Sequence, residues 1–168
     1  MIKILIVDDQ PHIRRVVRGL VEAEHDWVVC GEAANGQQAT EQCALLAPDL
    51  IILDINMPVM NGFEAAKIIH MRSPEVLILI STTDSSVHFA RAASKTGASG
   101  FLSKANSGEH LVEAMASLLN ARSIFWQLEG AMLQRLCFRT WRTVTPVLWM
   151  ISELRSSENL RKVKQTQI

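Results

Sequence analysis

The chain has 168 residues, and its 17 lysine and arginine residues are balanced by 17 aspartate and glutamate residues. A hydrophobic content of 48% excludes an intrinsically disordered chain, and no apolar run approaches the ~20 residues that a membrane span requires. The cysteines Cys30, Cys43 and Cys137 are widely spaced and form no C-x-x-C motif, which excludes a disulfide framework and a zinc site. We expect a cytoplasmic protein with reduced thiols and no membrane segment.

The even charge balance conceals two segments of opposite sign. Residues 1–120 contain nine basic and 14 acidic side chains, a net charge of −5, whereas residues 121–168 contain eight and three, a net charge of +5. Three of the four tryptophans also lie in the second segment. We therefore predict a domain over residues 1–120 and a basic, tryptophan-containing extension over residues 121–168.

Short apolar runs alternate with segments of helical period through residues 1–120. The runs are rich in β-branched residues and nearly continuous, which is typical of parallel strands buried on both faces. Strands are expected at residues 4–7, 27–30, 50–53, 76–80 and 100–102, and helices at about 11–24, 37–47, 62–71, 86–96 and 108–120. Pro11 suits a first helical turn, and Gly97 suits a turn that ends a helix. The pattern predicts an α/β fold, a doubly wound five-stranded parallel sheet with right-handed crossovers.

The extension has a different pattern from the domain that precedes it. From Ile124 to Trp141, apolar residues recur at steps of three and four with arginines between them, which predicts an amphipathic helix. Thr145-Pro146 indicates a break, because the residue before proline avoids the helical conformation. A second apolar stretch over residues 147–154 precedes a polar, basic end.

Polar side chains stand at the carboxyl ends of four predicted strands. They are Asp8 and Asp9 after the first, Asp54 after the third, Thr82 at the fourth and Lys104 after the fifth. Such strand ends meet at one crevice in a doubly wound sheet. Three clustered carboxylates repel one another unless a cation lies among them, and oxygen ligands of this kind suit Mg²⁺. With a lysine and a hydroxyl nearby, the site could neutralise a phosphoryl group during its transfer.

At these residues the sequence resembles the receiver domain of two-component response regulators, especially that of the LuxR-type transcription factors. The resemblance rests on three motifs: Ile2 to Asp9, Pro48 to Asp54 with the following Met57-Pro58, and Gly97 to Lys104. It covers residues 1–120 and implies the flavodoxin-like receiver version of the doubly wound fold. The ordered set of motifs is more specific than any one of them.

The resemblance implies a role for each acidic residue of the crevice. Asp54 is expected to accept a phosphoryl group from a sensor histidine kinase and to form an acyl phosphate. Asp8, Asp9 and Asp54 are expected to hold Mg²⁺ together with the backbone carbonyl of Asn56.

The resemblance also implies how the phosphoryl group is sensed. Lys104 is expected to pair with the phosphoryl oxygens, Thr82 to move its hydroxyl onto them, and Phe101 to rotate inward behind it. Ser81 competes for the hydroxyl role, but Thr82 has the family spacing of 22 residues to Lys104. Ala105 follows Lys104 where many receivers have proline, which argues against a cis peptide bond there.

Three functions from different classes fit these observations. We favour a phosphorylation-dependent switch that controls its output through protein contacts, without an enzymatic activity of its own. The alternative is a DNA-binding transcription regulator of the LuxR type, although the residues after Val144 are too few for a complete helix-turn-helix domain. An aspartyl phosphatase is disfavoured, because Asp54 is followed by Ile55 and Asn56 and so lacks an Asp-x-Asp motif. A homodimer could form through the receiver or through the C-terminal helix.

Overall fold

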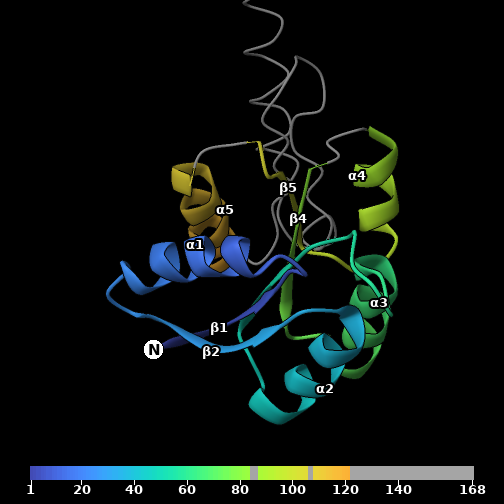
Figure 1. Ribbon diagram of the computed structural model, residues 1–168, viewed down its shortest axis with the longest axis horizontal. Helices are drawn as coiled ribbons and strands as arrows, with labels where there is room; N and C mark the ends of the chain where they lie inside the picture. Colours follow the sequence, from blue (N-terminus) through green and yellow to red (C-terminus); the bar gives the residue numbers. More distant parts are fainter. Residues whose placement is uncertain (84–86, 106–107, 122–168) are drawn as a thin grey trace, which may run out of the picture.

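A computed structural model describes residues 1–83, 87–105 and 108–121. In these residues five strands alternate with five helices (Figure 1). The strands are β1 (Ile2–Val7), β2 (Trp27–Ala33), β3 (Leu50–Leu53), β4 (Leu77–Thr82) and β5 (Gly100–Ser103). The helices are α1 (Pro11–Glu22), α2 (Gly36–Leu46), α3 (Gly62–Arg72), α4 (Val87–Ser94) and α5 (Gly108–Ala121).

The strands form one parallel sheet in the order β2-β1-β3-β4-β5, which confirms the doubly wound α/β fold. The chain first moves outward from β1 to β2 and then returns past β1 to β3, so the strand order reverses at β1 and β3. Ligands of such sheets bind outside the carboxyl ends of the strands at this switch point. Asp8, Asp9 and Asp54 follow these two strands directly.

The helices cover the sheet in two layers with different packing. One buried cluster joins the sheet to α1 and α5 through residues such as Val17, Val21 and Met115. The other joins it to α2, α3 and α4 and includes Phe101 of β5. Figure 1 shows α1 and α5 on one side of the strands and α2, α3 and α4 on the other.

The prediction of burial on both faces was wrong for β2. In this strand only Ala33 is fully buried, whereas all four residues of β3 are buried. β2 is an edge strand that pairs only with β1, but edge position alone does not decide burial, because β5 at the other edge is buried throughout. Trp27 and Val29 pack against the core on the α1–α5 side and Cys30 packs against the core on the other side, so both faces of this run are only partly covered.

Local side chains fix where the helices begin and end. Asn35 accepts the Gln38 N–H at 2.9 Å before α2, and Asn61 accepts the Glu64 N–H at 3.0 Å before α3, so each caps its helix. Gly97 has φ 82° in the turn after α4, which confirms its expected role. The predicted start of this helix at Ser86 and the predicted helix over residues 124–141 lie outside the described residues.

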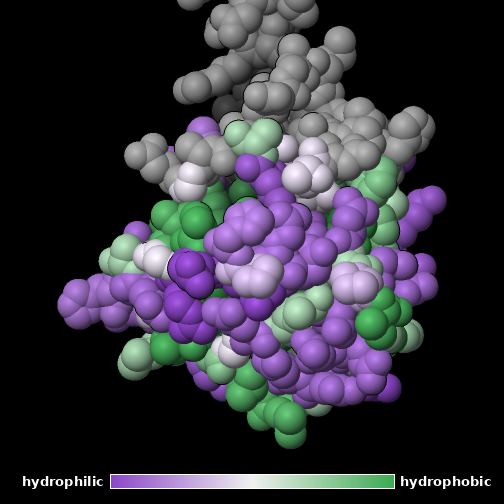
Figure 2. Space-filling view, viewed as in Figure 1, coloured by the Kyte–Doolittle hydropathy of each residue, from purple (hydrophilic) through white to green (hydrophobic). Residues whose placement is uncertain are grey.

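The described surface seen in Figure 2 is mainly hydrophilic, and its hydrophobic regions are separate spots on the left, at the bottom and on the right of the view. Large apolar side chains that are well exposed come from different elements, among them Val16, Leu45, Val59 and Met71. Among the described helices, none combines the length and the apolar character that crossing a membrane would need.

Candidate functional site

Three carboxylates meet at the switch point of the sheet. Asp8, Asp9 and Asp54 each offer an oxygen atom, and these oxygens all lie within 4.8 Å of one another. The strand pairing continues into the site: the Asp54 N–H donates to the Val7 carbonyl at 2.9 Å, and the Asp8 N–H donates to the Ala33 carbonyl at 3.1 Å. Asp8 and Asp54 are both only 4% exposed, so charge at this position is poorly solvated.

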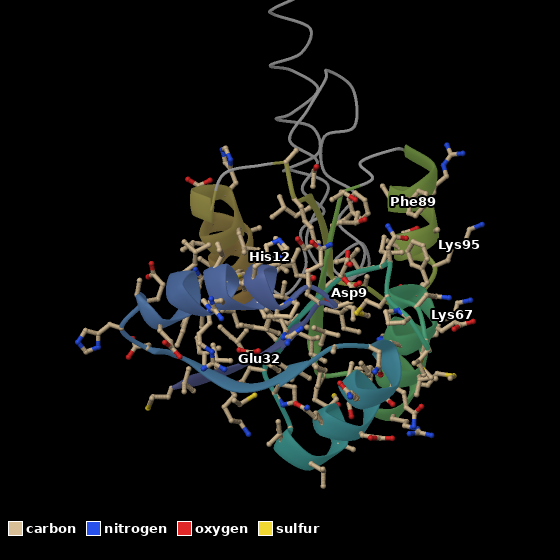
Figure 3. The ribbon with its side chains drawn as sticks, in the orientation of Figure 1. Asp9, His12, Glu32, Lys67, Phe89 and Lys95 are labelled. Carbon is tan, nitrogen blue, oxygen red and sulfur yellow. The ribbon has the colours of Figure 1, made fainter. Side chains whose placement is uncertain are left out.

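Lys104 supplies the positive charge that the carboxylates face. Its Nζ lies 2.6 Å from Asp8 Oδ2 and 3.1 Å from Asp54 Oδ1, and its side chain is 13% exposed. The residue follows β5, two strands away from β3, so the ion pairs connect the two halves of the sheet. In contrast, Lys67 and Lys95 extend outward from α3 and from the turn after α4, away from Asp9 (Figure 3).

The ionisation of Asp54 reflects two opposing influences. Burial raises the pKa of its carboxyl above the ordinary value, while the charge and hydrogen bond of Lys104 act to lower it, and burial prevails. Lys104 therefore favours the charged carboxylate without fully compensating for its desolvation. A further positive charge among the carboxylates would complete that compensation.

The donor set fits a hard divalent cation. Asp9 Oδ1 is buried and has no hydrogen-bond partner among the described residues, although its neighbour Asp8 is bonded through both carboxylate oxygens. An orphaned buried carboxylate oxygen is costly, and a cation would satisfy it. Because all the nearby ligand atoms are oxygens, Mg²⁺ suits the cluster better than metals that prefer sulfur or nitrogen.

The loop after β3 is folded tightly around Asp54. The Gly62 N–H donates to the Ile55 carbonyl at 2.9 Å, and a Cβ at Gly62 would overlap the carbonyl oxygen of Asp54. Glycine is therefore required at this position. Within the same loop Val59 has φ 69°, and the Met60 N–H reaches the Pro58 carbonyl at 2.8 Å across it, which forms a γ-turn.

An open groove of about 540 Å³ runs beside the carboxylates. Asp9 and Asn56 line its polar part, so the structure brings the predicted Asn56 next to the acidic cluster. The apolar part includes Phe63 of α3 and Phe89 of α4, whose ring centroids lie 5.8 Å apart. The remaining lining residues are Ile55, Met57, Pro58 and Asn61.

The predicted switch residues Thr82 and Phe101 lie on β4 and β5. Thr82 is fully buried, and its carbonyl accepts the Lys104 N–H at 2.7 Å, so the backbone links Thr82 to Lys104. Ser81, the competing hydroxyl, is also buried. Phe101 is 1% exposed and belongs to the core on the side of α2, α3 and α4, so its ring already faces inward. The described residues contain no cis peptide bond, in agreement with the expectation for Ala105.

Sequence reasoning missed one residue that contacts the site. Arg14 of α1 donates from Nη1 to the backbone carbonyl of Asp8 at 2.8 Å. Its side chain also pairs with Glu32 of β2 at 2.9 Å. The only signal in the sequence is that Arg14 and Arg18 are one helical turn apart on the first helix, which places both on one face.

Comparison with known proteins assigns the family. The family described as the response regulator receiver domain matches residues 4–116, well over half of the chain. The chain belongs to this family. The Transcriptional regulatory protein LnrK of Bacillus subtilis (strain 168) is 38% identical to the receiver over 118 residues, which cover 70% of this chain and 54% of that protein. The nitrate/nitrite response regulator protein NarL of Escherichia coli (strain K12) is 38% identical over 112 residues, covering 67% and 52%.

Solved structures agree with the fold of the receiver. A two-component response regulator of the LuxR family from Aurantimonas sp. SI85-9A1 superposes with a TM-score of 0.72 at 31% identity, covering 75% of this chain and 89% of that one. The response regulator domain of Thermotoga maritima CheB has a TM-score of 0.67 at 28% identity, covering 71% and 97%. The motifs that suggested a receiver therefore identified the family correctly.

The relatives differ in what accompanies the receiver. The chain spans about half the length of the curated transcriptional regulators that it matches. A protein-glutamate methylesterase/protein-glutamine glutaminase of Methanosarcina mazei is 39% identical over 108 residues, but these make up only 30% of that protein. Receiver domains thus occur in transcriptional regulators and in enzymes.

Proposed function

We propose that the chain is a phosphorylation-dependent switch of a two-component system, in which Asp54 accepts a phosphoryl group from a sensor histidine kinase. One observation carries the proposal: Lys104 bridges the buried Asp8 and Asp54 in a cluster of three carboxylates. Such a cluster is costly as a purely structural feature, because removing several charged groups from water can cost more free energy than their pairing returns. It is suited to a site that must gather a cation and a phosphoryl group.

The chemistry is a displacement at phosphorus. A carboxylate oxygen of Asp54 forms the new P–O bond, while the P–N bond to the kinase imidazole breaks and its electron pair stays with the imidazole nitrogen. Lys104, within 3.1 Å of the nucleophile, favours its charged form and then pairs with the phosphoryl oxygens. Asp8, Asp9, Asp54 and the Asn56 carbonyl would hold Mg²⁺, which supplies charge neutralisation to the transferring group.

The switch follows from the added charge. An acyl phosphate brings about two negative charges to the end of β3. Lys104 is bonded to both Asp8 and Asp54, so it must redistribute its contacts. The backbone N–H of Lys104 donates to the Thr82 carbonyl, so a movement of the Lys104 backbone is transmitted to β4. We assign Thr82 and Phe101 as the residues that respond, by moving the Thr82 hydroxyl toward the phosphoryl group and repacking the ring behind it.

The output is proposed to act through protein contacts of the receiver over residues 1–120. Residues 121–168 are proposed as a linker or extension, and the protein is proposed to form a homodimer through the receiver or the C-terminal helix. The alternative is a DNA-binding transcription regulator of the LuxR type. Two relatives are named as regulatory proteins of transcription, and both are longer than this chain's match to them. Salt-dependent retardation of DNA by the full chain, lost on deletion of residues 121–168, would favour this alternative.

Phosphorylation of the full chain tests the main proposal. Incubation with a small acyl phosphate and Mg²⁺ should add one phosphoryl group to the intact mass, and a chelator should prevent it. Asp54→Asn should abolish the addition, because an amide oxygen is a poor nucleophile and cannot form the acyl phosphate. Asp49→Asn is the matched control, since Asp49 is an exposed residue just before β3, at the opposite end of the strand from Asp54. Persistent labelling of the Asp54→Asn variant would refute the assignment.

A further inference from the structure

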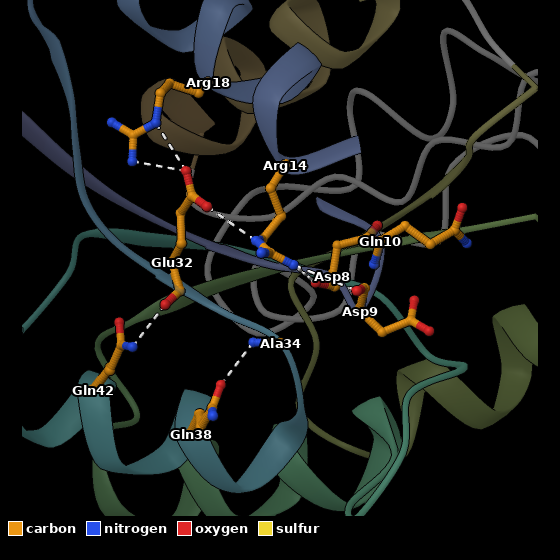
Figure 4. Close-up of polar contacts among 9 residues, drawn as sticks. All are labelled: Asp8, Asp9, Gln10, Arg14, Arg18, Glu32, Ala34, Gln38 and Gln42. Carbon is orange, nitrogen blue, oxygen red and sulfur yellow. Dashed lines mark hydrogen bonds and ion pairs between the residues drawn. The ribbon is translucent and has the colours of Figure 1, made fainter. Parts of the chain in front are cut away.

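Arg14 connects the first helix to the backbone that presents the metal-binding carboxylates. Its Nη1 donates to the Asp8 carbonyl at 2.8 Å and lies 3.5 Å from the Asp9 carbonyl (Figure 4). These two carbonyls belong to the residues that follow β1, where the regular strand pairing ends. The guanidinium therefore replaces the hydrogen bonds that a strand would otherwise provide.

Arg14 is itself held in place by Glu32. The Nε atom of Arg14 donates to Glu32 Oε2 at 2.9 Å, and Arg18 lies 2.7 Å from the other carboxylate oxygen, Oε1. Burial alone would raise the pKa of Glu32, but the hydrogen bonds from Arg18 and Arg14 outweigh it and lower that pKa. Glu32 thus stays charged and fixes the plane of the Arg14 guanidinium.

The carboxylates are oriented differently around this anchor. Asp8 Oδ1 accepts the Gln10 N–H at 2.9 Å and Oδ2 contacts Lys104, so both its carbonyl and its side chain are fixed. Asp9 has only the longer carbonyl contact to Arg14, and its buried Oδ1 has no partner among the described residues. The anchor holds the backbone while leaving an Asp9 oxygen for a cation.

We propose that Arg14 is a positioning residue of the magnesium site, which holds the Asp8–Asp9 backbone so that the Asp9 carboxylate faces the cation position. The inference rests on the proposed function of the acidic cluster. Arginine suits the role because its planar fork donates to Glu32 through Nε and to the carbonyls through Nη1 at the same time. Groups that orient metal ligands without touching the metal typically change metal affinity by ten- to a hundredfold.

The sign of the effect separates positioning from simple electrostatics. A guanidinium near the site repels Mg²⁺, so a purely electrostatic role predicts tighter binding when Arg14 is replaced by an uncharged residue. A positioning role predicts weaker binding, because Asp8 and Asp9 lose their fixed backbone. Arg18 provides the matched control: it shares Glu32 and carries the same charge, and its contacts are to Glu32 and Glu22.

Calorimetric titration of the full chain with Mg²⁺ tests the inference. We expect Arg14→Met to weaken Mg²⁺ binding about tenfold, and Arg18→Met to leave it within about twofold because the carbonyl bond remains. Glu32→Gln should weaken binding less than Arg14→Met. The double variant with both substitutions should bind Mg²⁺ no more weakly than Arg14→Met alone, because Glu32 affects the site only by holding Arg14. Arg14→Lys should fail to restore the affinity, because an ammonium cannot make both contacts.

Each remaining outcome is decisive. Unchanged or tighter binding by a folded Arg14→Met protein would overturn the inference, as would equal weakening by Arg18→Met. If Arg14→Met loses the native circular dichroism spectrum, Arg14→Lys decides: wild-type affinity in that variant would overturn the inference. Failure of the wild-type chain to bind Mg²⁺ at all would instead refute the proposed function, so the two failures are distinguishable.

Discussion

The two layers of helices are attached to the sheet by side chains of very different size. On the α1–α5 face the buried helical residues are mostly large, namely Val17, Val21, Leu111, Met115 and Leu118. On the α2–α3–α4 face they are mostly small, and those of α4 are Ala90 and Ala93. Burial of a Leu or Met side chain contributes about 1.5–3 kcal/mol, whereas the single methyl group of alanine contributes much less.

The difference indicates which face can repack at low cost. Small residues let a helix lie close to the sheet, but each of them buries little apolar surface, so a shift of the helix loses little burial. Phe101, one of the proposed switch residues, lies in the core of this small-residue face, and Phe89 of α4 is packed against the same core. The large-residue face instead carries Arg14 and the anchored Asp8–Asp9 backbone. The first face thus anchors the backbone of Asp8 and Asp9, and the second carries the groove and the residue that we propose to respond.

The largest expected effect tests this difference in anchoring. Met115 of α5 is fully buried, so Met115→Ala should lower the free energy of unfolding by about 3 kcal/mol through lost burial and a residual cavity. Ala90→Gly, in the middle of α4, should cost only about 1 kcal/mol, mainly through helix propensity. Urea denaturation followed by circular dichroism measures both. Equal losses in the two variants would contradict the comparison of the faces.

A smaller effect on stability comes from the ionisation of Asp54, which does not depend on how either layer of helices is packed. Burial raises the pKa of Asp54, so the folded protein binds this proton more tightly than the unfolded chain does. The stabilising contribution of the protonated group is present below the ordinary pKa and is lost as the pH rises through the raised value. Asp54→Asn cannot ionise and leaves Lys104 paired with Asp8. Without Mg²⁺ we expect a higher Tm than wild type at neutral pH, by about 2–4 °C per kcal/mol gained.

The pH dependence is the diagnostic part of this experiment. The Tm advantage of Asp54→Asn should shrink as the pH falls below the raised pKa, because the wild-type carboxyl is then protonated as well. Added Mg²⁺ should also reverse the order, since it stabilises the folded wild type by binding. An Asn variant that is less stable than wild type at neutral pH would show that the Lys104–Asp54 pair outweighs the cost of burial.

The sequence predicted the fold and the acidic cluster because both depend on order along the chain. Continuous apolar runs located the strands, and a parallel sheet brings the residues after β1 and β3 together whatever the details of packing. The edge position of β2 was not predictable in the same way, because it depends on which strands pair. Arg14 was missed for a related reason: its partners Glu32 and the Asp8 carbonyl are selected by the tertiary approach of α1, and an arginine on an amphipathic helix is ordinarily a solvated surface group.

The smallest predicted effect lies in the loop that leads into the small-residue face. Val59 is 78% exposed and has φ 69°, a conformation in which a β-branched side chain is strained. The γ-turn closed by Met60 and Pro58 holds it there. Val59→Gly removes the strain but adds freedom to the unfolded chain, so the free energy of unfolding should rise by about 0.5–1 kcal/mol. Val59→Ala keeps the positive φ and should gain less. A loss of stability on Val59→Gly, measured in urea, would show that the exposed valine contributes packing that outweighs its backbone strain.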